Sequence, residues 1–299
     1  MTITSLIVKG YSLINHSGVL DSAWGRRQFA KAYFFGKQHL DPVYANLTRH
    51  YPELFRGGPI IDVGANIGYM ASLFAKAAEP QYKVYAFEPE AANFEMLKEN
   101  VTTGKYRERI VPIQAAVGEQ DDLVELRRYP TSHAQHHIIT PEFKAALSAE
   151  AADLVEVPIV SLDSFIASKQ IQPLPCFVKI RVLGYELPVC LGMRHILDNS
   201  RNLTVAIAYT PDLLKGLGYE PNDLLNIFES RGFYFYAVNE QGKLLALPDP
   251  KAGIAELLTS SSFLVKSQLP LPDPKLKSQA PNNQDYLELL FSRRRLNEQ

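Results

Sequence analysis

The stretch that decides the fold reads Ile60-Ile61-Asp62-Val63-Gly64-Ala65-Asn66-Ile67-Gly68. Its first residues form a short apolar run, its two glycines flank a turn, and the run from Tyr69 to Ala78 has the apolar spacing of a helix. A strand, a glycine turn and a helix in this order are typical of the first unit of an open α/β sheet. The expected fold class is therefore α/β.

The composition is compatible with one large domain of this kind. Of the 299 residues 46% are hydrophobic and 21% are charged, so a sizeable core is expected, and the net charge of -1 gives no reason to expect a nucleic-acid partner. Cys176 and Cys190 lie in apolar stretches and are expected to be buried, reduced thiols. The N-terminal sequence MTITSLIVKGYSLINHSG has neither a basic leader nor a long apolar stretch, so we expect no signal peptide, no membrane partner and a cytoplasmic location.

The strand and helix pattern recurs along the chain. Alternation of this kind predicts a mostly parallel sheet with helices on both faces. Residues 123–127 and 155–160 are expected to be shorter strands that flank a polar insertion, and residues 261–267 a last, antiparallel strand. The remaining predicted strands cover residues 83–87, 109–116, 176–182, 202–209 and 232–238.

Three regions are expected. Residues 1–56 have the spacing of one or two helices and predict a helical leader or lid. Residues 57–268 form the α/β domain. Residues 269–299 begin with a stretch rich in proline and polar residues, which predicts a linker, and end with DYLELLFSRRRL, which predicts a short helix.

The first two predicted strands end in acidic residues, and this pattern indicates a ligand site. Ligands of open parallel sheets bind outside the carboxyl ends of the strands, where Asp62 and Glu88 stand. Gly64 and Gly68 allow the backbone to approach a ligand closely, and Asn66 lies between them. Glu88 can accept hydrogen bonds from both hydroxyls of a ribose through its two carboxylate oxygens.

Two ligand classes are compatible with an adenosine site of this kind. A dinucleotide needs the pattern G-x-G-x-x-G and no acid close to its pyrophosphate, whereas this turn reads G-A-N-I-G and follows Asp62. A carboxylate suits the ammonium group of a methionine moiety, so S-adenosylmethionine (SAM) is the preferred ligand. The alternative is that Asp62 and Glu88 only cap neighbouring helices.

The sequence resembles the FkbM family of SAM-dependent methyltransferases over roughly residues 59–266. The resemblance implies a Rossmann-like class I fold with a mostly parallel seven-stranded sheet and an antiparallel C-terminal strand. It also implies SAM as the methyl donor, contacts to it from Asp62, Gly64, Asn66, Gly68 and Glu88, and methylation of a hydroxyl on a small metabolite, sugar or polyketide. The segments that carry it are IIDVGANIGYM, VYAFEPEAANFEMLKENV, IQAAVGE, VPIVSLDSF, FVKIRVLGYE and the ending from RGFYFYAV to SSFLVK.

The fourth and fifth strands depart from the family pattern. The family usually reads Lys-Ile-Asp-Val-Glu-Gly in the fourth strand and often has a glutamate at the end of the fifth. This chain instead has Arg181, Leu183 and Ala208, while Glu186 is retained. Three explanations are compatible with these substitutions. The chain is a SAM-binding protein without catalysis, or it is an enzyme in which Arg181 holds an anionic substrate, or the substitutions are secondary losses or engineered. Arg181 can also pair with a carboxylate of the chain, including Glu186 itself.

Three histidines in the polar insertion, His133, His136 and His137, are further candidates for chemistry. One of them can act as a base near neutral pH, or the segment is an exposed loop. No cysteine or clustered carboxylate accompanies them, so no metal is expected. The candidate catalytic residues are therefore Arg181, Glu186 and His136, and the sequence leaves the oligomeric state open.

Overall fold

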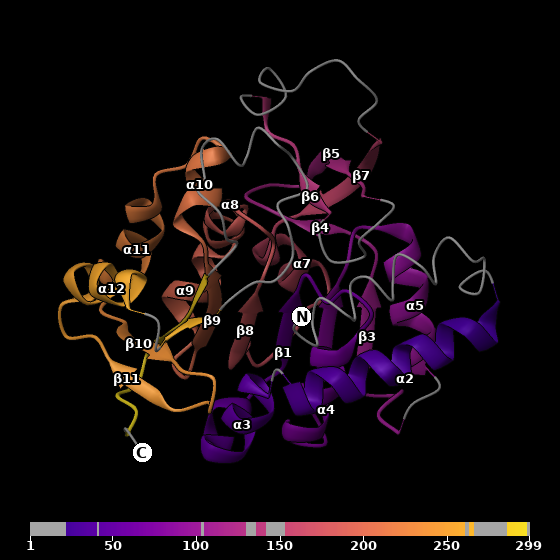
Figure 1. The fold of residues 1–299 in the computed structure, drawn as a ribbon, viewed down its shortest axis with the longest axis horizontal. Helices are drawn as coiled ribbons and strands as arrows, with labels where there is room; N and C mark the ends of the chain where they lie inside the picture. Colours follow the sequence, from indigo (N-terminus) through magenta and orange to yellow (C-terminus); the bar gives the residue numbers. More distant parts are fainter. Residues whose placement is uncertain are drawn as a thin grey trace.

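A mixed nine-stranded sheet forms the centre of the part of the chain that the computed structural model describes (Figure 1). The described residues are 22–40, 42–102, 105–129, 136–141, 153–260, 263–265 and 286–297. The strand order is β11-β10-β13-β9-β8-β1-β2-β3, and β12 pairs with β13. The bounds are β1 (Ile60–Val63), β2 (Val84–Phe87), β3 (Ile110–Ile113), β8 (Phe177–Ile180), β9 (Thr204–Tyr209), β10 (Tyr234–Val238), β11 (Leu244–Ala246), β12 (Leu264–Val265) and β13 (Tyr286–Ser292).

The parallel centre of the sheet has its reversal point at β1. That strand pairs in parallel with β2 on one side and with β8 on the other. The chain therefore builds β2 and β3 outward in one direction and returns to place β8 and β9 in the other. The turn after β1 lies at this reversal, where open α/β sheets bind their ligands.

The C-terminal segment corrects one prediction. Residues 286–292 form a strand, β13, and not the predicted helix, and this strand pairs antiparallel with both β9 and β10. Leucine and glutamate favour helices locally, but Phe291 and three leucines of β13 are buried in the core clusters on the two faces of the sheet, and this long-range packing and pairing outweighs local propensity. Of the predicted strand at 261–267 the structure describes residues 263–265, where the two-residue β12 pairs antiparallel with β13. The antiparallel strand of the predicted fold is therefore β13.

Helices cover both faces of the sheet because successive side chains of the central strands point to opposite sides. Ile60 belongs to the core cluster that contains side chains of α3, α4 and α5, and Ile61 to the one that contains side chains of α7, α8, α9 and α11. The bounds of the helices are α2 (Ala23–Leu40), α3 (Val43–His50), the 3-10 helix η2 (Pro52–Phe55), α4 (Tyr69–Ala77), α5 (Ala91–Thr102), α7 (Leu162–Ser168), α8 (Glu186–Leu191), α9 (Arg194–Asn199), α10 (Pro211–Gly216), α11 (Pro221–Glu229) and α12 (Pro250–Thr259).

The predicted N-terminal leader forms helices over the residues that the structure describes. Leu47 of α3 and Leu54 of η2 are fully buried in the core, so this part of the leader is continuous with the α/β domain. Helix α2 lies across α5, to which it is tied by an ion pair between Arg26 and Glu99 at 2.6 Å. Residues 1–21 lie outside the described residues, and a lid function for the leader stays a prediction.

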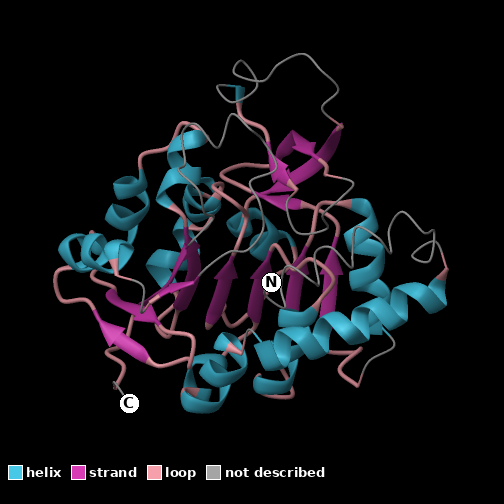
Figure 2. Ribbon diagram, viewed as in Figure 1, coloured by secondary structure: helices cyan, strands magenta, loops and turns pink. Residues whose placement is uncertain are grey.

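A second, four-stranded sheet of order β4-β7-β5-β6 follows β3 directly and lies at the top of the view in Figure 2. The predicted strands at 123–127 and 155–160 are its antiparallel centre, β5 and β7. The other two strands are two residues long. The bounds are β4 (Ala116–Val117), β5 (Asp122–Arg127), β6 (His137–Ile138) and β7 (Leu154–Val160).

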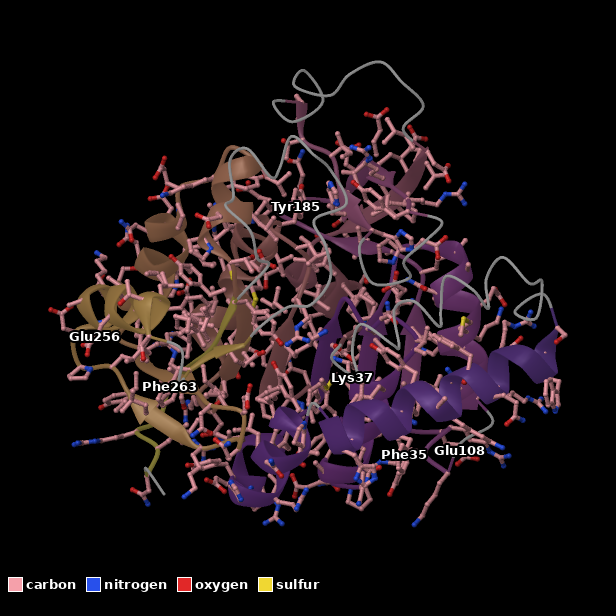
Figure 3. The ribbon with its side chains drawn as sticks, viewed as in Figure 1. Phe35, Lys37, Glu108, Tyr185, Glu256 and Phe263 are labelled. Atoms are coloured by element: carbon pink, nitrogen blue, oxygen red, sulfur yellow. The ribbon has the colours of Figure 1, made fainter. Side chains whose placement is uncertain are left out.

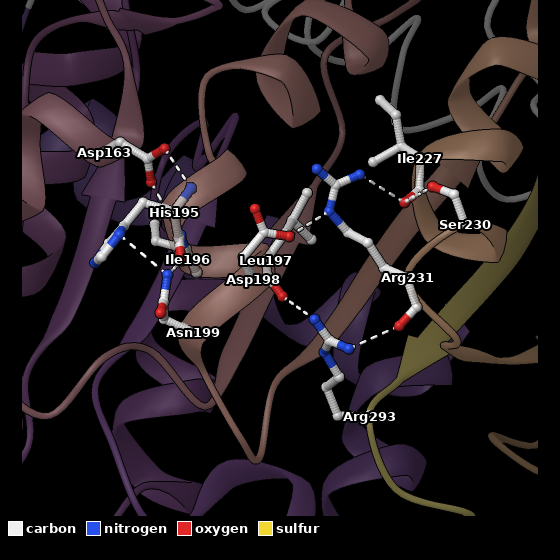
Figure 4. Close-up of polar contacts among 10 residues, drawn as sticks. All are labelled: Asp163, His195, Ile196, Leu197, Asp198, Asn199, Ile227, Ser230, Arg231 and Arg293. Atoms are coloured by element: carbon white, nitrogen blue, oxygen red, sulfur yellow. Dashed lines mark hydrogen bonds and ion pairs between the residues drawn. The ribbon is translucent and has the colours of Figure 1, made fainter.

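Polar contacts around α9 fix the end of β13 (Figure 4). Asp163 accepts hydrogen bonds from the amides of His195 and Ile196, at 2.7 and 3.1 Å, where α9 begins. Arg293, which follows β13, donates to the carbonyl of Leu197 and, at 2.7 Å, to that of Arg231. The last strand is thus anchored to helix ends formed much earlier in the chain.

No helix within the described ranges has the length and apolar character needed to cross a membrane.

Candidate functional site

The turn after β1 has a backbone that requires glycine at both of its flanks. Gly64 and Gly68 have φ angles of +73° and +92°, in the left-handed region, and Asn66 between them has a φ of +49°. A Cβ on Gly64 would stand 2.2 Å from the carbonyl oxygen of Arg181, so β1 and β8 approach each other too closely for any side chain. Asn66 is compatible with its conformation because its side-chain oxygen accepts the next amide, that of Ile67, at 2.8 Å. The two glycines of the motif are therefore structural requirements of the turn.

A lysine from β8 holds this turn from inside the sheet. Lys179 Nζ donates to the carbonyl oxygens of Val63 and Gly64, at 3.1 and 2.8 Å, and pairs with Asp62 Oδ1 at 3.0 Å. Burial lowers the pKa of Lys179, and the carboxylate of Asp62 opposes this effect. Asp62 has no exposed surface, so in this geometry it acts on the turn through Lys179. A contact between Asp62 and a ligand stays a prediction.

Glu88 connects the end of β2 to the same turn. Its Oε2 accepts the amide of Asn66 at 2.9 Å and its Oε1 accepts the amide of Glu90 at 3.1 Å. Burial of the carboxyl group raises its pKa to about 7, although the two amide hydrogen bonds favour the charged form. The group is therefore poised between its two protonation states near neutral pH.

These residues have the chemistry of an adenosine site. A carboxylate has about four acceptor positions, and the amides of Asn66 and Glu90 and the side chain of Asn93 use three of those of Glu88, so a position is left for a hydroxyl of a ribose. The carboxylate also lies beside the turn at the reversal point of the sheet, where Gly64 and Gly68 have no side chains of their own. The residues present are therefore compatible with SAM. The five predicted contacts, Asp62, Gly64, Asn66, Gly68 and Glu88, all lie at this point of the structure.

Arg181 pairs with a carboxylate that the sequence prediction did not name. Its Nη2 lies 3.0 Å from Glu288 Oε2 and 2.5 Å from the hydroxyl of Tyr286, and its guanidinium stands over the Tyr286 ring at 4.6 Å. The hydroxyl of Tyr44 on α3 donates to the other oxygen of Glu288. The side chain of Glu288 is 2% exposed, whereas that of Arg181 is 25% exposed. An ion pair within the chain was among the predictions, but the partner is Glu288 of β13 and not Glu186.

The register of the sheet explains why arginine and alanine occur together here. Ala208 of β9 lies directly opposite Glu288 of β13, and Arg181 follows β8, on the other side of β9. Two strand spacings are about 9.5 Å, which a long arginine side chain can bridge over a methyl group. A glutamate at 208 would stand between Arg181 and Glu288, beside a second acid. The acid of this region is thus supplied by β13 in place of β9.

Glu186 shapes the backbone after β8. Its carboxylate accepts the amides of Val182 at 3.2 Å and Gly184 at 3.0 Å, and the side chain is fully buried. Burial raises its pKa to about 7. Between these amides Leu183 takes a φ of +52°, an uncommon conformation for a leucine. The geometry therefore gives Glu186 a structural role in the turn.

The histidines of the polar insertion reach the second sheet. His136 Nδ1 accepts the amide of Tyr129 at 3.0 Å, and burial lowers the pKa of the ring, with Glu90 the largest opposing influence. His137 is buried and stacks on Tyr129. His133 lies outside the described residues. No cluster of three metal-binding side chains occurs among the residues whose placement is described.

Four residues of this region were not predicted from the sequence: Lys179, Tyr44, Tyr286 and Glu288. Lys179 and Glu288 carried a usable signal, because a charged residue within a buried apolar strand needs a partner of opposite charge. The two tyrosines carried none. Their position depends on α3 and β13, which meet only in the folded chain.

The strand order, with an antiparallel strand between two parallel ones, and the glycine turn beside Glu88 define a Rossmann-like class I SAM-dependent methyltransferase fold. Within this class the chain belongs to the FkbM methyltransferase family. The family model of the methyltransferase FkbM domain matches residues 62–235, which is more than half of the chain.

Two curated relatives are similar to parts of the chain. The 31-O-demethyl-FK506 methyltransferase FkbM of Streptomyces tacrolimicus is 27% identical over 201 residues, which cover 57% of this chain and 76% of that protein. The hexuronic acid methyltransferase AglP of Haloferax volcanii is 26% identical over 146 residues, which cover 49% of this chain and 54% of that protein.

Solved structures show weaker similarity. The methyltransferase FkbM of Methylobacillus flagellatus is 17% identical with a TM-score of 0.40, over 60% of this chain and 40% of that one. The precorrin-6y C5,15-methyltransferase of Geobacter metallireducens is 11% identical with a TM-score of 0.41, over 83% of this chain and 85% of that one. The family assignment does not depend on these two structures.

Proposed function

We propose that this protein binds SAM at the turn from Gly64 to Gly68 and transfers its methyl group to a hydroxyl of a small metabolite, sugar or polyketide. The observation that supports this most is Glu88, a buried carboxylate that two backbone amides orient beside a turn locked by Lys179. The two curated relatives act on 31-O-demethyl-FK506 and on a hexuronic acid, and both acceptors support a hydroxylated small molecule as the acceptor class.

In this proposal the protein contributes mainly by positioning. SAM supplies a methyl group on a positively charged sulfur, and holding the acceptor oxygen in line with it provides much of the rate. Glu88 accepts a hydrogen bond from a ribose hydroxyl. The exposed part of the Arg181 guanidinium places a positive charge on the side of the site where the methyl acceptor binds. His136 suits a hydrogen-bond donor better than a base, because its Nδ1 accepts an amide and the proton of the neutral ring is then on Nε2. Glu186 maintains the turn after β8.

Binding is tested by calorimetric titration of the purified chain with S-adenosylhomocysteine. We expect saturable heat from the native protein and its loss in Glu88→Ala. Asp163→Asn is the matched control, because Asp163 also accepts two backbone amides but does so at the start of α9 (Figure 4). Absence of heat in the native protein, or equal loss in the control, would contradict the proposal.

A second candidate function is SAM binding without turnover. It is favoured by Arg181, Leu183 and Ala208, which leave no acid at the family positions after β8 and at the end of β9. Restoring the family residues requires four changes, because Glu288 faces Ala208: Arg181→Asp, Leu183→Glu, Ala208→Glu and Glu288→Leu.

Methyl transfer to a panel of hydroxylated metabolites separates the two candidates. Activity of the native chain supports the enzyme and shows that the rearranged charges are functional. Activity of the fourfold variant alone would show that the native chain binds SAM without turnover.

A further inference from the structure

Helix α2 has an aromatic and basic stripe on the face that points away from the domain. Trp24 and Phe35 are 68% and 67% exposed, the highest values among the large hydrophobic side chains of the described residues. They are eleven residues apart, so they lie within about 20° of each other around the helix and about 16 Å apart along it. Lys31 lies between them on the same line, and Arg27 is exposed beside it. We call Trp24, Arg27, Lys31 and Phe35 the α2 stripe.

The opposite face of α2 is already used for packing. Phe29 and Ala30 are buried against Ile67 and Met96. Arg26 pairs with Glu99, and this contact fixes the rotation of the helix. Phe35 and Lys37 project to opposite sides of α2 in Figure 3. The exposure of the α2 stripe is therefore set by the way the helix docks on α5.

The charge of α2 differs from that of the whole chain. The chain has 31 lysines and arginines against 32 aspartates and glutamates. Helix α2 has four basic residues, Arg26, Arg27, Lys31 and Lys37, and no acidic one. Helices that lie on membrane surfaces are held by apolar and aromatic side chains that enter the headgroup layer and by basic side chains that attract anionic lipids, and the α2 stripe has both kinds of side chain.

We propose that the α2 stripe docks this protein on the surface of a membrane that contains anionic lipids. The helix would lie on the bilayer without crossing it, and the proposal therefore revises the expectation from the sequence that the chain has no membrane partner. A second copy of the chain is a poorer occupant. Antiparallel pairing of two α2 helices would bring Arg27 of one close to Lys31 of the other, and like charges would face each other across the interface.

The test exploits the fact that the chain has one tryptophan, Trp24, which lies in the stripe. Full-length protein is mixed with vesicles of phosphatidylcholine alone or of equal parts phosphatidylcholine and phosphatidylserine. We expect a blue shift of tryptophan fluorescence and co-sedimentation only with the anionic vesicles, and both should weaken as salt is added. Absence of binding to the anionic vesicles would overturn the proposal, as would equal binding to both kinds.

Two variants that retain Trp24 locate the contact. Lys31→Glu removes one attraction and adds one repulsion, so anionic-vesicle binding should fall roughly thirtyfold. Phe35→Ser should weaken it at least about tenfold. Leu123→Ser is the control, because Leu123 is also an exposed apolar side chain but lies on β5. All are surface changes, and unchanged thermal unfolding confirms that they fold.

Three results would overturn the assignment to α2. One is an equal loss of anionic-vesicle binding in the Leu123→Ser control. Another is anionic-vesicle binding by Lys31→Glu that is as strong as that of the native protein. The third is a blue shift that grows with protein concentration in the absence of vesicles, because it would show that a second copy covers the stripe.

Discussion

Replacing Arg181 by methionine should destabilise the fold, because it leaves Glu288 buried without its cation. Arg181 lies 3.0 Å from a carboxylate whose side chain is 2% exposed, and Tyr44 then remains as a hydrogen-bond donor to it. Removing one partner of a buried ion pair costs about 3–5 kcal/mol. Arg181 is 25% exposed, so water screens part of the interaction and we expect the lower end, about 3 kcal/mol.

Urea denaturation at neutral pH measures this loss as a lower midpoint with an unchanged slope. Arg194→Met is the matched control, since Arg194 pairs with Glu119 at the similar distance of 2.9 Å but both side chains are at least half exposed. That pair should contribute less than about 1 kcal/mol. In the double variant Arg181→Met, Glu288→Leu, an apolar pair replaces the ion pair, and most of the stability should return.

Two outcomes would refute this reasoning. If Arg181→Met lost no more stability than Arg194→Met, the ion pair would not be a buried one in solution. If the double variant were as unstable as Arg181→Met, the loss would come from packing of the arginine and not from the carboxylate of Glu288.

Three further predictions concern the cofactor turn and the last strand. The pKa of Glu88 is raised to about 7, and ribose hydroxyls favour its ionised form, so S-adenosylhomocysteine should bind about tenfold more weakly at pH 6 than at pH 8. Calorimetry should detect proton release on binding near pH 7. An equal pH dependence in Glu88→Gln would show that the effect does not come from titration of Glu88. Gly64→Ala should cost about 3 kcal/mol of unfolding free energy, because its Cβ would meet the carbonyl of Arg181 and its φ is positive; a midpoint equal to that of the native protein would show that the turn can relax. Phe291→Ala should cost about 3–5 kcal/mol, because Phe291 is fully buried and stacks on Phe228 at 3.9 Å; a loss below about 1 kcal/mol would mean that β13 is not part of the stable sheet.

The turn from Gly64 to Gly68 and its neighbour Glu88 were predictable because their determinants are close together in the sequence. Gly64, Asn66 and Gly68 form one turn, and their positive φ angles are a local property. Glu88 ends the next strand, and parallel strands bring their carboxyl ends to the same edge of a sheet. Periodicity and turn chemistry were therefore sufficient to predict this region.

The other half depends on contacts between distant segments. DYLELLFSRRRL has the local preferences of a helix, and only the space between β9 and β10 makes residues 286–292 a strand. Arg181 and Ala208 look like the loss of acids in the sequence, and only the register of β13 shows that Glu288 lies opposite Ala208 and pairs with Arg181. The α2 stripe is visible as aromatic and basic residues, but its exposure depends on the docking of α2 on α5.

The sequence alone determined the fold class and the glycine turn with Glu88, because strand and helix periods and left-handed turns are set by neighbouring residues. The tertiary structure alone decided the partner of Arg181, the identity of the antiparallel strand and the burial of Asp62 against Lys179. The physical reason is that a charge in a core is stabilised by whatever segment the fold places beside it, and that segment can be more than a hundred residues away, as Glu288 is from Arg181.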